Sequence, residues 1–327
     1  MSTLSRYRKP LQYAFALVAL AAIVWIVAAN WDAFSTAVLG MEPWWLLGSL
    51  AAGAVAVVCS MLAWRSIVIA FGHRVSRADA SRIIFISQIG KYIPGGVWPI
   101  VAGTALGIRA GIPGPITAAT ILVQLLVSVA TGSVASIGVL FAFPQLQEFA
   151  WLVWAAAALG ILLLLPPVME RWLRWGFRLI RRSSTLPESI GAASLGVATL
   201  WSFASWAAFG LHLWCVVSAT VGPDPELILL SVSAFAFAWV VGFLFIIAPA
   251  GAGVRELVLG VVLASSVGSA ALLGIVIVSR MMLLVVDLAM FGGALVSARR
   301  TAGGDPAALP DGLRPDGPDE AAGAPAD

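Results

Sequence analysis

Long apolar runs, each able to cross a lipid bilayer, dominate this chain. A membrane-spanning helix needs about 20 mainly apolar residues. Composition agrees, because 61% of the 327 residues are hydrophobic and only 11% are charged, whereas soluble domains carry roughly 25% charged residues. We therefore expect an all-α, polytopic integral membrane bundle. The clearest candidate spans are 11–29, 43–70, 115–142, 190–220 and 268–298, with one more between the loops at 143–149 and 169–189.

The distribution of basic residues predicts the topology. Lysine and arginine gather at the N-terminus, near residues 75 and 180, and after the last span, whereas the loops near 36, 146 and 223 carry only acidic charges. Positive loops face the cytoplasm, so the chain is predicted to lie in the cytoplasmic (inner) membrane with both termini on its cytoplasmic side. This gives a cytoplasmic N-terminus (1–10), a transmembrane domain (11–300) and a tail (301–327). The tail is rich in Gly, Pro, Ala and Asp and is expected to be disordered.

This topology leaves two segments that begin and end on the same side. Residues 79–110 begin and end at the cytoplasmic face, and residues 226–266 begin and end outside. Each is broken near its middle by small or helix-breaking residues, IPGG at 93–96 and APAGAG at 248–253. Irregular backbone at membrane depth is tolerated only where protein buries it or where it lines a wet cavity. The sequence therefore predicts two broken re-entrant hairpins.

The order of span, broken hairpin and span occurs twice, over about 43–142 and about 190–298. The copies enter from opposite sides, so they form an inverted repeat of the kind found in secondary transporters, with about six full spans and two hairpins. A competing interpretation has about eight simple spans. In it, residues 227–248 cross fully, and residues 254–298 form two crossings with a turn near Arg280.

Charged residues beside both breaks predict a binding site. A helix that restarts after a break directs free N–H groups toward it, and such ends favour anions. Charges within a membrane are costly and mark function. We therefore predict a pocket for a phosphate-bearing lipid head group. The alternative is that the glycines only allow close packing and that Lys91 extends to the interface. The predicted substrate-binding residues are Lys91, Pro94, Gly95, Gly96, Trp98, Gly251, Gly253, Arg255, Glu256 and Arg280.

Other polar residues inside the spans have structural interpretations. Glu256 is predicted either to pair with Arg280 or to bind a cationic head group. Arg280 and Asp287 lie two helical turns apart on one face, which favours an internal pair. His212 is expected to be packed rather than a ligand, and Gln124 to bond a neighbouring helix. No disulfide, metal or cofactor is expected.

Enzyme signatures are missing from the sequence. It has no paired aspartates for magnesium and diphosphate, no G-x-S-x-G, no H-E-x-x-H and no P-loop. We therefore expect a protein that is not an enzyme. The net charge of +3 does not indicate nucleic-acid binding, because most basic residues lie in short loops. The expected partners are membrane lipids with phosphate head groups, and a membrane-enzyme partner or a homo-oligomer remains open.

Two motifs, QIGKYIPGGVWP at 88–99 and APAGAGVRE at 248–256, resemble the lysylphosphatidylglycerol synthase transmembrane-domain family. That family includes the flippase part of the bacterial multiple peptide resistance factor, and the resemblance covers most of residues 10–300. It implies movement of an aminoacyl-phospholipid or another anionic lipid, such as a polyprenyl phosphate, across the cytoplasmic membrane. Lysyl transfer is not expected, because only a short tail follows Arg300. The alternative function is a non-catalytic accessory subunit of a lipid-linked glycosyltransferase or lipid synthase.

Overall fold

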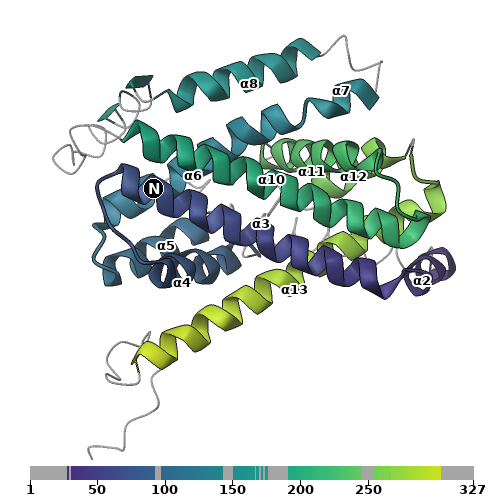
Figure 1. The fold of residues 1–327 in the computed structure, drawn as a ribbon, viewed down its shortest axis with the longest axis horizontal. Helices are drawn as coiled ribbons and strands as arrows, with labels where there is room; N and C mark the ends of the chain where they lie inside the picture. The colour runs from purple at the N-terminus through teal and green to yellow at the C-terminus, as the bar shows by residue number, and fades with distance from the viewer. Residues whose placement is uncertain are drawn as a thin grey trace, which may run out of the picture.

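The computed structural model describes residues 28, 31–92, 97–142, 150–165, 167–168, 171, 174–175, 191–244, 253–264 and 266–302. Regular structure within these residues is entirely helical. The long helices lie side by side as a bundle (Figure 1). The predicted first span at 11–29 lies almost entirely outside the described residues, as do the tail beyond 302 and most of the loop at 169–189.

Five helical stretches are long and apolar enough to cross a membrane. They are α3 (Pro43–Ala70), the run Gly114–Leu140 that joins α6 (Gly114–Ala135) to α7 (Gly138–Ala142), α10 (Ala192–Val221), α11 (Leu227–Leu244) and α13 (Ser269–Ala302). The shorter elements are α2 (Trp31–Leu39), α4 (Arg77–Gln88), the 3₁₀ turn η1 (Ile89–Tyr92), α5 (Trp98–Arg109), α8 (Ala150–Leu164) and α12 (Val254–Leu263). The predicted polytopic helical bundle is confirmed. Helix α2 occupies a segment that was expected to be a loop.

Helices α3 and α10 form the central antiparallel pair (Figure 1). The residue before α3, Glu42, donates its N–H to Ala219 near the end of α10 at 3.2 Å. Reciprocally, the residue before α10, Gly191, donates to the carbonyl of Ala70 at the end of α3 at 3.0 Å. Such reciprocal end contacts are what a pseudo-two-fold axis in the membrane plane produces. They agree with the inverted order of the two repeats.

The same contacts sort the loops by side. The bond between Gly191 and Ala70 places the start of α10 and the basic loop that follows α3 at one end of the bundle. Arg82 Nη2 donates to the carbonyl of Ser297 at 2.8 Å, which brings the end of α13 to that end as well. The bond between Glu42 and Ala219 joins the acidic loops at the other end. This grouping matches the loop charges, and the choice of the basic end as cytoplasmic stays a prediction.

Helices α4 and α5 pack together as the first hairpin. Each has 12 residues and rises about 18 Å, well short of the roughly 30 Å hydrocarbon core. A Cβ atom at Gly90 would lie 3.0 Å from the backbone of Trp98, so glycine lets η1 approach the start of α5. On α5, Gly103 and Gly107 approach α6 closely, as small residues do in membrane helix pairs.

Helices α11 and α12 form a second hairpin with unequal arms. Helix α11 has 18 residues and α12 has 10, so α12 rises only about 15 Å and does not cross. Gly253 begins α12 with a φ of 83°, a left-handed conformation that favours glycine. Helix α13 runs without interruption through Arg280. The turn near Arg280 that the interpretation with about eight simple spans requires therefore does not occur. Its other feature, a full crossing by residues 227–248, agrees with the length and apolar composition of α11.

A buried histidine joins three long helices in the core. Nδ1 of His212 on α10 lies 2.8 Å from the hydroxyl of Ser49 on α3, and its Nε2 lies 2.9 Å from the hydroxyl of Ser279 on α13. The His212 side chain is fully buried, as expected for a packed residue. Gln124 Nε2 likewise donates to the carbonyl of Ser60 at 2.8 Å and bonds α6 to α3. These polar contacts fix the packing of the bundle around both hairpins.

Candidate functional site

Lys91, just before the first break, forms a salt bridge with α13. Its Nζ lies 2.6 Å from Oδ2 of Asp287, and the Tyr92 hydroxyl donates to the same oxygen at 2.5 Å. The Asp287 side chain is only 7% exposed, whereas the Lys91 side chain is 35% exposed. The aspartate thus neutralises the lysine. The prediction that Asp287 pairs with Arg280 is therefore wrong. Asp287 pairs with Lys91 instead, because η1 brings the ammonium group of Lys91 to α13.

Glu256 in the first turn of α12 uses both of its carboxylate oxygens. Oε1 pairs with Nε of Arg280, and Oε2 accepts the Gly253 N–H at 2.6 Å. Of the two roles predicted for Glu256, the structure therefore shows the pairing with Arg280. The N–H of Gly253 was expected to be open to an anion, but Glu256 occupies it. The carboxylate also lies at the positive end of α12, where negative charge is favourable.

Arg255 has a different environment from its two cationic neighbours. Its guanidinium carbon lies 5.3 Å from the ring centroid of Trp239 on α11, within cation–π range. Its Nε is buried and has no hydrogen-bond partner among the described residues. Gly242 makes room for the side chain, since a Cβ there would lie 2.5 Å from Cγ of Arg255. Arg255 is thus positioned by apolar contacts, with no carboxylate bound to it in the described part of the chain.

Residues from both hairpins and from α13 form one charged cluster, which we define as Lys91, Tyr92, Arg255, Glu256, Arg280 and Asp287. Helix α13 links the two halves of the cluster, because Asp287 binds Lys91 of the first hairpin and Arg280 binds Glu256 of the second. Arg280 and Asp287 belong to the apolar span of α13, which places the cluster at membrane depth. Its three cations and two carboxylates leave one positive charge in excess. This arrangement favours an anion.

A model of the "Lysylphosphatidylglycerol synthase TM region" family matches residues 12–290. The chain belongs to this family. The match includes both hairpins and every residue of the charged cluster, and it confirms the resemblance carried by the two sequence motifs. No curated protein matches the chain. Membership in the lysylphosphatidylglycerol synthase TM-region family makes the chain a lipid-related membrane protein.

The structure brings together some of the predicted binding residues of this lysylphosphatidylglycerol synthase TM-region protein. Lys91, Arg255, Glu256 and Arg280 lie in the cluster, and Gly253 caps α12 beside it. Trp98 opens α5, with its backbone against Gly90. Four other predicted residues lie outside the described part of the chain: Pro94, Gly95, Gly96 and Gly251.

Sequence reasoning missed four contributors to the site. Tyr92 and Asp287 surround the Lys91 ammonium, and Trp239 and Gly242 surround Arg255. Tyr92 stood beside Lys91 in the family motif, so its position was a usable signal. Trp239 and Gly242 lie in an apolar run that contains no charged residue and no proline. Nothing in that run indicated that these two residues belong to the site. Within the described residues, no group of three or more His, Cys, Asp or Glu side chains fits a metal ion.

Proposed function

We propose that this protein moves a lipid whose head group contains an anionic phosphate across the cytoplasmic membrane and that it does so without being an enzyme. The lipid class includes phospholipids, aminoacyl-phospholipids and polyprenyl phosphates. The observation that supports this proposal is the excess positive charge of the cluster on α13, at a depth where charges mark function. Family membership supports a lipid substrate.

Arg255 is the proposed first contact for the phosphate. Its guanidinium has no carboxylate partner in the described residues, and a planar guanidinium suits bidentate bonds to phosphate oxygens. The phosphodiester of a phospholipid carries one negative charge, which balances the single positive excess of the cluster. The occupied site then becomes neutral, and the cost of a net charge at membrane depth falls.

Lys91 and Arg280 contribute differently in this proposal. Each is held by a carboxylate in the structure, so neither offers a free charge to an arriving lipid. Their salt bridges lower the cost of keeping cations in the membrane, and they position the hairpin tips against α13. A phosphate bound by Arg255 weakens these pairs by competing for the same cations. In this proposal the lipid moves because Lys91 and Arg280 exchange their carboxylate partners for the lipid phosphate and then return to them.

Purified protein in liposomes tests the proposal. Lipid transfer is measured with fluorescently labelled phosphatidylglycerol, using an impermeant reductant that bleaches only the outer leaflet. We expect wild-type protein to accelerate transfer, Arg255→Gln to slow it about tenfold or more, and Arg255→Lys to retain part of the rate. Arg109→Gln is the matched control, because Arg109 is exposed at the end of α5.

Two outcomes would overturn the proposal. Equal rates for Arg255→Gln and Arg109→Gln would remove Arg255 from the lipid path. Transfer by none of the proteins, with folding confirmed, would favour a non-catalytic accessory subunit of a lipid synthase or glycosyltransferase instead.

A further inference from the structure

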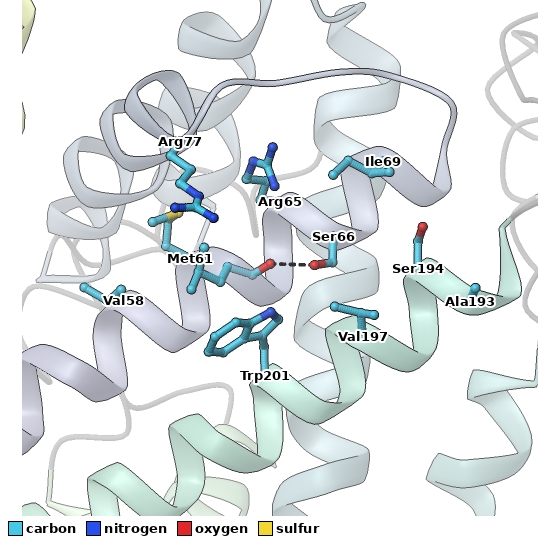
Figure 2. A pocket seen from close by; sticks show the side chains of 11 residues that line it. Val58, Met61, Arg65, Ser66, Ile69, Arg77, Ala193, Ser194, Val197 and Trp201 are labelled. Atoms are coloured by element: carbon cyan, nitrogen blue, oxygen red, sulfur yellow. Dashed lines mark hydrogen bonds between the residues drawn. The ribbon is translucent and has the colours of Figure 1, made fainter.

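A groove of about 590 Å³ lies at the end of the bundle that carries the basic loops. It is bounded by the second half of α3 and by the starts of α4 and α10. Figure 2 shows Arg65 and Arg77 on one side, with Val197 and Trp201 of α10 on the other. The lining residues include Arg65, Ile69, Arg77, Ser194, Val197 and Trp201.

The polar part of this groove is cationic. Arg65 and Arg77 both line it, and none of its lining residues is acidic. Arg65 Nε donates to the carbonyl of Val75 at 3.0 Å, which fixes the arginine side chain near the start of α4. Ala193 and Ser194 belong to the first turn of α10, whose positive end adds to the same potential. The groove therefore attracts anions.

The rest of the groove is apolar and open to the side of the bundle. Ile69, Val197 and Trp201 are 37%, 44% and 36% exposed, and these side chains face outward in a chain built of membrane-spanning helices. A tryptophan near arginines is typical of the membrane–water interface. A cationic end joined to an exposed apolar wall has the chemical pattern of a two-part ligand, with a charged head and hydrocarbon chains.

We propose that this groove is a second lipid site, which holds an anionic glycerophospholipid of the leaflet that it faces. The lipid phosphate lies against Arg65 and Arg77, and an acyl chain follows Val197 and Trp201. The site is separate from the charged cluster, because Arg77 begins α4 and Lys91 follows its end, about 20 Å away along the helix. The proposal does not depend on transport.

Native mass spectrometry of the full chain in phospholipid nanodiscs tests the head-group contact. All proteins carry Arg255→Gln, so that the charged cluster contributes little to retention. We expect phosphatidylglycerol to be retained in preference to phosphatidylcholine, and Arg77→Gln to reduce that preference about fivefold. Arg77 is exposed, so its replacement leaves the fold intact. Arg109→Gln, which removes an exposed arginine outside the groove, is expected to keep the preference.

A second measurement locates the lipid. Brominated acyl chains quench tryptophan fluorescence on contact, and we expect brominated phosphatidylglycerol to quench more than brominated phosphatidylcholine. Trp201→Phe removes that difference if the lipid lies in the groove. An unchanged difference in Trp201→Phe, or equal phosphatidylglycerol retention by Arg77→Gln and Arg109→Gln, overturns the proposal. Soluble glycerol phosphate that binds as tightly as the lipid also overturns it, because the apolar wall would then contribute nothing.

Discussion

The ammonium of Lys91 and the carboxylate of Asp287 lie 2.6 Å apart. Tyr92, the residue after Lys91, bonds the same carboxylate, although it lies 195 positions before Asp287 in the sequence. This salt bridge ties the tip of the first hairpin to a helix of the second repeat. The carboxylate is buried and the ammonium is one-third exposed. The lysine is therefore the more accessible partner, and the aspartate is the partner that loses most when the pair is broken.

Lys91→Ala is expected to lower the free energy of unfolding by about 1–3 kcal/mol. Loss of the ammonium leaves a buried carboxylate with only the Tyr92 hydroxyl as a described partner, and the estimate is reduced because Lys91 is partly exposed. Thermal unfolding in detergent measures the effect. Lys91→Ala with Asp287→Asn removes both charges and is expected to recover most of the stability. A double variant no more stable than Lys91→Ala would show that the pair is not coupled.

Glu256 and Arg280 are expected to show a coupling energy of about 1–3 kcal/mol in a double-mutant cycle built on Gln substitutions. Glu256→Gln keeps an oxygen that accepts the Gly253 N–H and removes only the charge. Glu256→Ala also removes the cap and is expected to cost about 1 kcal/mol more. Unfolding of the four Gln-cycle proteins gives the coupling energy. Additive effects would mean that the ion pair contributes no stability.

Gly242→Ala is expected to displace Arg255 and to reduce lipid transfer and stability together. The added methyl group would lie 2.5 Å from Cγ of Arg255, and overpacking of this kind costs about 1–3 kcal/mol. Gly196→Ala is the matched control, because a Cβ at Gly196 meets nothing within 4 Å. Transfer rates and melting temperatures of both variants are compared. Equal behaviour would show that Arg255 adjusts freely.

Cysteine labelling tests which end of the bundle is cytoplasmic. In a background with Cys59 and Cys215 replaced by alanine, Arg74→Cys is expected to resist an impermeant thiol reagent in intact cells, and Pro223→Cys to react. Both positions are exposed, so access depends on the side of the membrane alone. The reverse pattern would invert the topology predicted from loop charges. Lysed cells, in which both cysteines react, provide the control.

The charges of the loops and the positions of helix-breaking glycine and proline residues predicted most of the architecture. Residues 43–70 were expected to be one span, and α3 has those bounds. Within the described residues, the bonds of Gly191 to Ala70 and of Glu42 to Ala219 place the basic loop near 75 and the acidic loops near 36 and 223 at opposite ends. These features were accessible because helix length and side preference depend on local composition. Helix α2 was missed because it has only nine residues, far fewer than a membrane span needs, and it lies between two predicted spans.

Partners within the site were harder to predict. Helical spacing placed Arg280 and Asp287 on one face, and that spacing suggested a pair between them. The structure instead gives each of them a partner from a different hairpin, Glu256 and Lys91. Tertiary packing decides such choices, because several opposite charges compete at similar distance. Periodicity within one helix carries no information about which hairpin tip arrives beside it.

Helix α13 carries the partners of both hairpins on one unbroken rod. Arg280 and Asp287 lie about 10 Å apart along its axis, and no glycine or proline interrupts the turns between them. The spacing of the two ion pairs is thus fixed by helix geometry. If one hairpin moves, its own ion pair is strained, while the other ion pair still holds α13 in place. If α13 moves, both ion pairs are strained together. The charged cluster is therefore also a mechanical linkage between the two halves of the chain.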